Sequence, residues 1–174
     1  PALLHLTLFP PGLHTRTMPL GIGLIGSYLL ANIPNGSAGV GLYKFADELD
    51  EDSRQVEFDV VGVSMYCWNS GLNLHYAKKI KASNPSAIVV CGGPNMGTDK
   101  AWIIEFLRKN PVVDFLVPFD GERAFTEVVK RILSTDIRQE DTVAGTFTLT
   151  KDGTQLLYGG DDDPKLMKVA SLDE

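Results

Sequence analysis

The sequence predicts an α/β fold of the Rossmann or flavodoxin type, in which helices flank a parallel sheet and a β-hairpin follows near the C-terminal end. Three observations lead to this prediction. Between residues 59 and 133, short apolar runs alternate with amphipathic segments of about 10 to 15 residues, which is the pattern of βαβ units. The apolar runs are nearly continuous, as in strands that are buried on both faces. Alternating strands around a Lys-Asp-Gly-Thr turn predict the hairpin at residues 145–160.

The first part of the chain is predicted to add two strands and two helices. The apolar run at residues 2–9 is followed by Pro-Pro-Gly and predicts the first strand and a loop. Residues 18–32 have helical spacing, and their glycines allow close approach to a sheet or to a ligand. Residues 39–45 predict a second strand, and residues 46–55 predict one or two turns of helix. One face of the helix at residues 18–32 carries Leu20, Leu24, Tyr28 and Ala31.

The later units are more regular and set the domain boundaries. Strands are predicted at residues 59–66, 87–94 and 112–119, and helices at residues 70–85, 98–111 and 120–133. Thr98 or Asp99 is suited to cap the second of these helices, and Asn-Pro pairs are suited to end the first two. We expect a Rossmann-like domain at residues 1–140, a β-hairpin extension at residues 141–160 and a linker at residues 161–174.

Composition limits the classes of function. The chain has 174 residues, 44% of them hydrophobic, and a formal net charge of −6, which suits one globular domain without a basic surface for nucleic acid. Its two cysteines are too few for a disulfide framework and fit a reducing compartment. No apolar run reaches the roughly 20 residues of a membrane span, and no secretory signal is visible. We therefore expect a cytoplasmic protein with neither nucleic acid nor membrane as a partner.

The sequence offers no catalytic residue and no metal site. It lacks a dinucleotide fingerprint, a Walker motif and a nucleophile elbow. His5, His14 and His75 are scattered; His75 is interpreted as a surface or packing residue, and His14 is only a weak candidate. Cys67 and Cys91 could face one another across adjacent strand ends, but two cysteines make a poor metal site. We interpret both as small buried residues.

The features that favour a site lie where the predicted strands end. Ligands of open parallel sheets bind at the carboxyl ends of the strands. Small residues there, Ser64, Gly92, Gly93 and Gly121, allow close backbone approach, and Tyr66 and Trp68 can form an apolar wall. Each feature alone also has a structural interpretation: a cover over the helices, a tight turn, or a helix cap in the Asp-Gly-Glu run. Their occurrence along one edge favours a binding site.

The order of these motifs resembles the N-terminal cobalamin-binding domain of the B12-dependent radical SAM enzymes. Pro-Leu-Gly precedes the first helix, and the runs "DVVGVSMYCWN", "NPSAIVVCGGP" and "VDFLVPFDGERAF" follow. The corresponding family runs are roughly D-V-I-G-x-S-x-Y-x-W-N, N-P-x-x-x-I-V-L-G-G-P and V-D-x-x-V-x-G-E-G-E-x-x-F. The resemblance covers about residues 1–133. The chain departs from it at Phe119-Asp120, where the family has Gly-Glu, and in a short, irregular second βα unit.

This resemblance implies a cofactor and a partner. It implies a flavodoxin-type domain that holds base-off cobalamin at the carboxyl edge of the sheet, with the dimethylbenzimidazole tail inserted among strands and loops. The Asp-x-His-x-x-Gly run of histidine-ligated B12 proteins is missing, which implies binding without a histidine ligand. The Cys-x-x-x-Cys-x-x-Cys motif is missing as well. The resemblance therefore implies a separate radical SAM catalytic domain, in cis or in trans, with a 4Fe-4S cluster, S-adenosylmethionine and methyltransferase-like chemistry, to which the linker would lead.

The strand ends and the resemblance together select the candidate cofactor-binding residues. One group precedes or begins the first helix, and the others follow the strands; they are Pro19, Leu20, Gly21, Ser64, Met65, Tyr66, Trp68, Asn69, Gly92, Gly93, Pro94, Asn95, Gly121 and Glu122. Two alternatives use the same edge. One is a flavodoxin-like domain that binds a flavin or another nucleotide, and the other is an interaction module without a ligand.

Overall fold

The computed structural model describes residues 2–6, 19–134 and 141–160. The weak histidine candidate, His14, and the linker expected at residues 161–174 lie outside the described residues. Within the described ranges, no helix combines the length and the apolar character that crossing a membrane requires.

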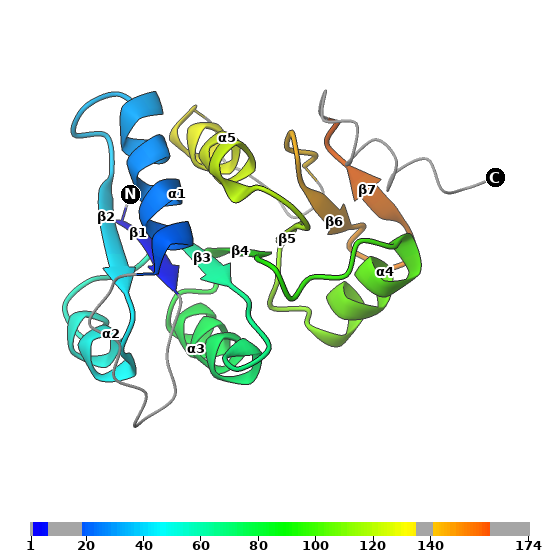
Figure 1. Ribbon diagram of the computed structural model, residues 1–174, viewed down its shortest axis with the longest axis horizontal. Coiled ribbons are helices and arrows are strands. Elements are labelled where there is room, and N and C mark those ends of the chain that lie inside the picture. Colours follow the sequence, from blue (N-terminus) through cyan, green and yellow to red (C-terminus); the bar gives the residue numbers. More distant parts are fainter. Residues whose placement is uncertain (1, 7–18, 135–140, 161–174) are drawn as a thin grey trace.

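A single seven-stranded sheet organises the molecule, with the strand order β2-β1-β3-β4-β5-β6-β7 (Figure 1). Strands β1 to β5 are parallel, and β6 and β7 are antiparallel to their neighbours. The order 2-1-3-4-5 of the parallel part is that of flavodoxin-like sheets, so the predicted fold class is confirmed. The strands span Ala2–Leu6 (β1), Gly39–Tyr43 (β2), Val60–Ser64 (β3), Ile88–Gly92 (β4), Phe115–Val117 (β5), Phe147–Leu149 (β6) and Leu156–Tyr158 (β7).

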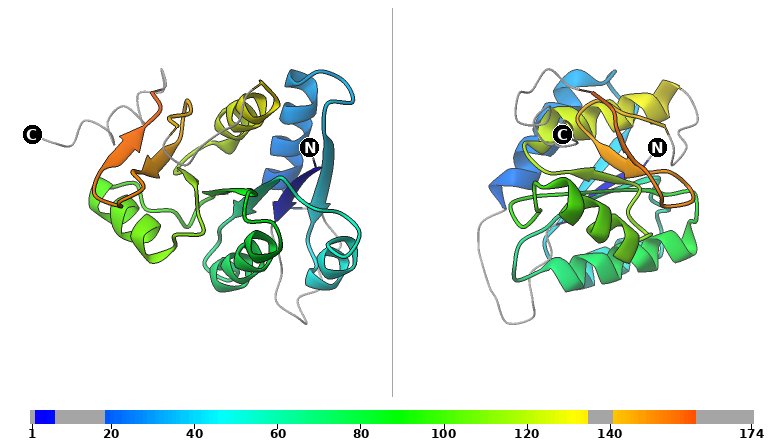
Figure 2. Two further views of the ribbon diagram at one scale, coloured as in Figure 1. Left: turned by 180° about the vertical axis from the view of Figure 1, so that it is seen from behind. Right: turned by 90° about the vertical axis from the view of Figure 1, so that its right-hand side faces the viewer.

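Helices cover both faces of the sheet, as the βαβ pattern predicted. Helices α1 and α5 lie side by side on one face, and α2, α3 and α4 lie on the other (Figures 1 and 2). The helices span Leu20–Asn32 (α1), Ala46–Asp52 (α2), Ser70–Ser83 (α3), Lys100–Lys109 (α4) and Gly121–Ser134 (α5). At the start of α4, Asp99 accepts a 2.8 Å hydrogen bond from the backbone N–H of Trp102, which identifies it as the N-cap.

Helix α1 packs with a face different from the one that its most regular apolar spacing suggests. Leu20, Leu24 and Tyr28 are 76%, 48% and 38% exposed, whereas the buried residues of the helix are Ile22, Gly26 and Leu29. A Cβ atom at Gly26 would lie 3.4 Å from the side chain of Leu42 in β2. The helix therefore approaches the sheet through its glycine-containing face.

The C-terminal hairpin extends the sheet. Strand β6 pairs with β5 at Leu116 and Phe147, and the rings of Phe147 and Tyr158 stack with centroids 4.7 Å apart. Arg108 of α4 donates a 2.9 Å hydrogen bond from Nε to the carbonyl of Gly153 at the hairpin turn. The hairpin thus shares the core that lies beneath α4.

Candidate cofactor pocket

On one face of the sheet, the side chains become smaller toward the carboxyl ends of the strands. Side chains alternate along a strand, so Val60, Gly62 and Ser64 of β3 point toward α1 and α5. Their partners in β4 are Ile88, Val90 and Gly92. Successive pairs along the two strands are therefore Val with Ile, Gly with Val, and Ser with Gly. This decrease in size leaves space above the ends of the strands.

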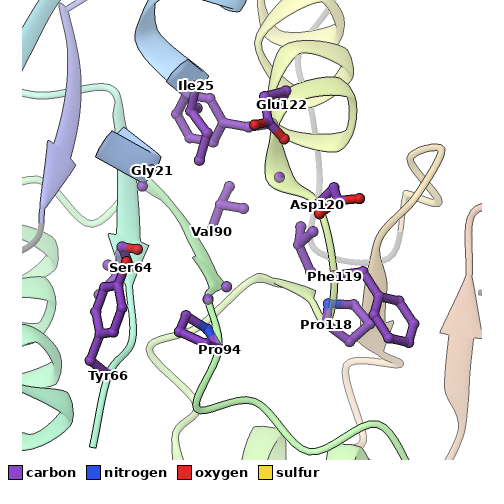
Figure 3. A pocket seen from close by; sticks show the side chains of 17 residues that line it. Gly21, Ile25, Ser64, Tyr66, Val90, Pro94, Pro118, Phe119, Asp120 and Glu122 are labelled. Atoms are coloured by element: carbon purple, nitrogen blue, oxygen red, sulfur yellow. The ribbon is translucent and has the colours of Figure 1, made fainter. Parts of the chain in front are cut away.

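The space is a pocket of about 320 Å³ between the sheet and the first turns of α1 and α5 (Figure 3). Gly21 and Ile25 of α1 line one side, and Gly121 and Phe125 of α5 line another. The segment that leaves β5 closes the third side with Val117, Pro118, Phe119 and Asp120. Both helices begin at the open edge, so residues one turn into each helix form the inner end of the pocket.

Ser64 places a buried hydroxyl group on the floor of this pocket. The residue is only 7% exposed, and it lines the pocket (Figure 3). Its carbonyl accepts hydrogen bonds from Asn69 Nδ2 at 3.3 Å and Asn73 Nδ2 at 2.9 Å. Because Ser64 lines the pocket, its hydroxyl can donate or accept a hydrogen bond with a bound molecule.

The glycines of the pocket divide into two kinds. Gly93 has a φ of 110°, and a Cβ there would lie 2.8 Å from the backbone N and O of Met65. A Cβ at Gly92 would lie 3.0 Å from the carbonyl oxygen of Val117. The chain itself requires glycine at these positions. Of the residues that the structure describes, a Cβ at Gly21 would meet only the hydroxyl of Tyr66, at 3.6 Å, so their packing leaves room there.

An aromatic pair stands at the mouth of the pocket. The rings of Tyr66 and Trp68 stack with centroids 4.7 Å apart and an interplanar angle of 18°. Tyr66 lines the pocket, whereas Trp68 is 51% exposed. Asn69 fixes this turn, because its Oδ1 accepts a 2.8 Å hydrogen bond from the backbone N–H of Tyr66. The turn therefore holds a flat apolar surface toward solvent next to the pocket.

The charge of the pocket is negative. Asp120 and Glu122 line it, and no Lys, Arg or His is among the described residues that do so. Acidic residues are favourable at the start of α5, where the helix dipole is positive. Helix α1 begins differently: Pro19 supplies no side-chain cap, and no acidic residue lies in the first turn. The first backbone N–H groups of α1, which have no acceptor within the helix, are therefore suited to donate to a ligand at the rim.

The structure brings most of the predicted site residues together. Those that line the pocket are Gly21, Ser64, Tyr66, Gly92, Gly93, Pro94, Gly121 and Glu122.

The remaining candidates lie around the pocket without lining it. Pro19 and Leu20 lie at the start of α1, and Trp68 packs on Tyr66. Met65 is fully buried on the opposite side of the sheet, and Asn69 is buried in the turn. The amide of Asn95 donates to the hydroxyl of Ser70 at 3.0 Å, away from the pocket.

Several lining residues were not predicted. Ile25 and Phe125 follow Gly21 and Gly121 by one helical turn, and Gly62 precedes Ser64 by one alternation of the strand. The i, i+4 spacing of a helix and the i, i+2 spacing of a strand are the signals that could have identified them.

The two cysteines differ in their surroundings. Cys91 is fully buried in the core beneath α3 and α4, and burial raises the pKa of its thiol to about 12. Cys67 is exposed in the turn after β3. The interpretation of both as buried residues is therefore right for Cys91 and wrong for Cys67. A thiol with so high a pKa is neither a nucleophile nor a ready metal ligand at neutral pH.

Comparison with known proteins finds relatives of one kind. The chain is 34% identical over 117 residues to the cobalamin-dependent radical SAM methyltransferase TokK of Streptomyces tokunonensis, which is 67% of this chain and 16% of that protein. It is 30% identical over 116 residues to the 2-(S-pantetheinyl)-carbapenam-3-carboxylate methyltransferase of Streptantibioticus cattleyicolor, which is 64% of this chain and 16% of that protein. The chain thus spans about 16% of the length of these relatives. No protein-family model matches it.

Solved structures show the same fold. The cobalamin-dependent S-adenosylmethionine radical enzyme OxsB, with aqua-cobalamin and S-adenosylmethionine bound, superposes with a TM-score of 0.65 at 15% identity over 93% of this chain and 22% of that one. The apo form of OxsB gives 0.61 at 16% identity, over 90% of this chain and 21% of that one.

The fold and the pocket define the chain as a flavodoxin-type α/β domain with a pocket at the carboxyl edge of its sheet. Its homologues are cobalamin-dependent radical SAM methyltransferases, so the resemblance identified from the motifs is confirmed. Its partial coverage of these enzymes fits their B12-binding domain.

Proposed function

We propose that this chain is the cobalamin-binding module of a larger B12-dependent radical SAM enzyme, and that it holds the cofactor base-off, without a histidine ligand to cobalt. The observation that carries the proposal is the pocket between the sheet and helices α1 and α5, with the buried hydroxyl of Ser64 on its floor. The relatives that are known as cobalamin-dependent enzymes support the identity of the cofactor.

The size of the pocket supports the base-off form. A volume of about 320 Å³ suits one group the size of a small ligand and is too small for a complete corrinoid. The nucleotide tail would therefore enter the pocket, and the corrin ring would remain outside it. A base that occupies the pocket cannot also coordinate the cobalt. The Asp-x-His-x-x-Gly run of histidine-ligated B12 proteins is missing from the sequence, which supports binding without a histidine ligand.

The residues of this chain would bind and orient the cofactor. Ser64 would hydrogen-bond a polar atom of the tail, and the open space at Gly21 would admit it. The backbone N–H groups of Leu20 and Gly21 would face its polar linker, because the start of a helix favours anionic groups. Tyr66 and Trp68 would contact the flat corrin. The bound cobalt would supply the methyl-transfer chemistry.

The catalytic part of the enzyme would lie in another domain. Radical SAM chemistry needs a cluster motif that this chain does not contain, and the chain covers a small share of its relatives. We therefore expect a 4Fe-4S cluster and S-adenosylmethionine in a partner domain, in cis or in trans. The cytoplasmic location expected from the composition remains a prediction.

Retention of cofactor tests the proposal. The purified chain is mixed with hydroxocobalamin or with FMN and desalted, and the absorbance of the protein fraction is recorded. We expect cobalamin to be retained and FMN to be lost, because the relatives of this chain are cobalamin-dependent enzymes. Retention of FMN alone would favour the flavin-binding alternative. Retention of neither, with binding of the strand ends to a partner protein, would favour the interaction module.

Two further measurements test the finer parts. Reduction to the Co(II) form and electron paramagnetic resonance would report the axial ligand, and nitrogen superhyperfine splitting would contradict base-off binding without histidine. Trp68→Ala should weaken cobalamin retention and leave the fold intact, because half of this side chain is exposed. Unfolding of that variant would show that Trp68 serves packing instead.

A further inference from the structure

The outer side of helix α1 exposes an apolar surface. Leu20, Leu24 and Tyr28 recur every fourth residue and are 76%, 48% and 38% exposed. This spacing places them along one face of the helix, and the exposed Ala31 continues that face. We call these four residues the α1 stripe. Of the six large hydrophobic side chains that are exposed in the described part of the chain, four belong to α1, so the exposed apolar surface is concentrated on this helix.

The composition of α1 differs from that of the other long helices. Its 13 residues include no charged residue, whereas the exposed positions of α3, α4 and α5 include Lys79, Arg108 and Arg131. Helix α5 lies beside α1, and the remaining helices lie on the other face of the sheet (Figure 1). A helix that is hydrophobic all round is normally buried, and large exposed apolar patches mark interaction surfaces. The outer side of α1 is therefore suited to contact with another protein surface.

A membrane is a poorer match for this helix than a protein. Helices that lie on a membrane surface combine an apolar face with a polar face rich in Lys and Arg. Helix α1 contains neither residue type, and its polar side chains are those of Ser27, Tyr28 and Asn32. The amide of Asn32 donates to the carbonyl of Tyr28 at 2.8 Å, so it serves the end of the helix itself. The helix thus offers no cationic group to lipid headgroups.

The apolar surface continues from α1 to the rim of the pocket. Leu20 is the first residue of the helix, and the next residue, Gly21, lines the pocket. A Cβ at Gly21 would lie 3.6 Å from the hydroxyl of Tyr66, on which Trp68 stacks. Trp68 is itself 51% exposed. A partner that covers the α1 stripe would therefore also reach the aromatic pair at the mouth of the pocket.

The relatives indicate where such a partner would come from. The matched region is 16% of the length of each of the two methyltransferases, so more than four fifths of each relative lies outside it. A domain that belongs to a larger enzyme needs an apolar surface for contact with the rest of that enzyme, because charged residues are depleted in the core of protein interfaces. Helix α1 supplies such a surface.

We infer that the α1 stripe is the surface against which the rest of the larger enzyme docks. The inference rests on the proposed function, because it takes the chain to be one module of that enzyme. Among the side chains of the stripe, only the hydroxyl of Tyr28 can form a hydrogen bond. The docked surface is therefore apolar opposite Leu20 and Leu24, where a charge would lose water without gaining a partner.

Hydroxyl-radical footprinting read by mass spectrometry tests the inference. The oxidation rates of Leu24 and Tyr28 are compared in the purified chain and in the complete enzyme that contains it. We expect both rates to fall about fivefold or more in the complete enzyme, because the core of an interface excludes water. Val56, which follows α2 and is 42% exposed, is the internal reference and should keep its rate.

A matched pair of variants locates the docking surface. Leu24 and Leu30 are 48% and 50% exposed on the same helix, but they point about 120° apart around its axis. In the complete enzyme, Leu24→Glu should return Tyr28 to the oxidation rate of the isolated chain, because the interface would otherwise bury an unpaired charge. Leu30→Glu should leave Tyr28 protected. If the complete enzyme with Leu24→Glu does not fold, Leu24→Ser makes a milder change in the same direction.

The outcomes separate the inference from the proposed function. Equal oxidation of Leu24 and Tyr28 in the chain and in the complete enzyme would overturn the inference. Slow oxidation in the isolated chain would overturn it as well: a rate that rises on dilution would mean that a second copy covers the stripe, and a constant rate that another part of the same chain does. Protection of Tyr28 in both glutamate variants would exclude the stripe as the docking surface.

Cobalamin retention by the isolated chain is independent of the stripe. Leu24 does not line the pocket, so the isolated chain with Leu24→Glu should retain cobalamin as the original chain does. Failure of the original chain to retain cobalamin would contradict the proposed function, whatever the footprint of α1. Retention by the original chain, without protection of the stripe in the complete enzyme, would overturn only the docking inference.

Discussion

The two faces of the sheet have opposite properties at the carboxyl ends of the same strands. Toward α2, α3 and α4, the residues Val61, Val63, Met65 and Cys91 are large or medium-sized, apolar and almost completely buried. Toward α1 and α5, the interleaved residues Gly62, Ser64 and Gly92 leave a pocket. One face stabilises the fold, and the other face is the one at which we propose that the cofactor binds. Small residues indicate a site here because they fall on alternate positions and therefore on one face.

The largest effect is expected where the chain requires glycine for its own geometry. Gly93→Ala places a methyl group 2.8 Å from backbone atoms of Met65 at a φ of 110°. We expect a loss of about 3 kcal/mol or more in the free energy of unfolding. Chemical denaturation measures it, and Gly21→Ala is the control because a Cβ there makes only an ordinary contact. Equal stability of the two variants would contradict the division of these glycines into structural and binding positions.

The next largest effect is expected from a comparison of the stability losses caused by truncating one valine on each face of the sheet. Val63 is 1% exposed and packs beneath α3, whereas Val90 is 4% exposed and borders the pocket. Val63→Ala should cost about 2 kcal/mol, because it opens a cavity in a closed core. Val90→Ala should cost less without ligand, because part of its surface already faces empty space. Thermal or urea unfolding of both variants checks this, and an equal loss would show that the pocket face is packed as tightly as the other.

The sequence predicts the fold in most respects, because strands and helices depend on local patterns. It also locates the edge of the sheet where the pocket lies. It does not predict which face of α1 packs, because that helix is apolar all round and contains no charged residue. Contact of Gly26 with Leu42 decides this, and it follows from tertiary packing.

The site shows the same limit. Ser64 and Gly121 are visible as small residues at strand ends, but Ile25 and Phe125 enter the pocket only through the placement of two helices against each other. Asn69 is an example of the opposite error, in which the sequence suggests a binding role that the structure does not show. Its type and position suggest a ligand contact, but its side chain bonds the backbone of its own turn, at Tyr66 N and Ser64 O. A turn of this kind is not recognisable from residue types alone.

A smaller effect, on binding alone, distinguishes the pocket from the rest of α1. Gly21→Val would project methyl groups into the pocket, whereas Gly23→Val lies on the same helix outside it, with nothing within 4 Å of a Cβ. We expect Gly21→Val to weaken cobalamin binding about tenfold, or 1.4 kcal/mol, with little change in stability. Gly23→Val should leave the dissociation constant unchanged. Titration monitored by cobalamin absorbance gives both values, and a similar loss in both variants would refute a role for the open space at Gly21.

The smallest effect on stability is expected from polar contacts between α2 and α3, on the face of the sheet without the pocket. Asp50 in α2 accepts hydrogen bonds from Lys79 Nζ at 2.6 Å and from the hydroxyl of Tyr76 at 3.1 Å, both in α3. The bond from Lys79 holds the pKa of this carboxyl below its usual range. A carboxyl with a lowered pKa binds fewer protons in the folded state than in the unfolded state. Its contribution is therefore present above its ordinary pKa of 3.8 and is lost as the pH falls below that value.

The contribution of the Asp50–Lys79 pair to stability is small because both side chains are partly exposed to solvent. The Asp50 side chain is 34% exposed, and Lys79 is 51% exposed, so solvent screens the pair to about 0.5 kcal/mol. Asp50→Asn should remove this part of the pH dependence, which falls below the ordinary pKa of 3.8, and should leave cobalamin binding unchanged, because the residue lies on the face away from the pocket. Urea unfolding at several pH values measures the difference between the two proteins. A change in cobalamin affinity in this variant would mean that the two faces of the sheet are coupled rather than independent.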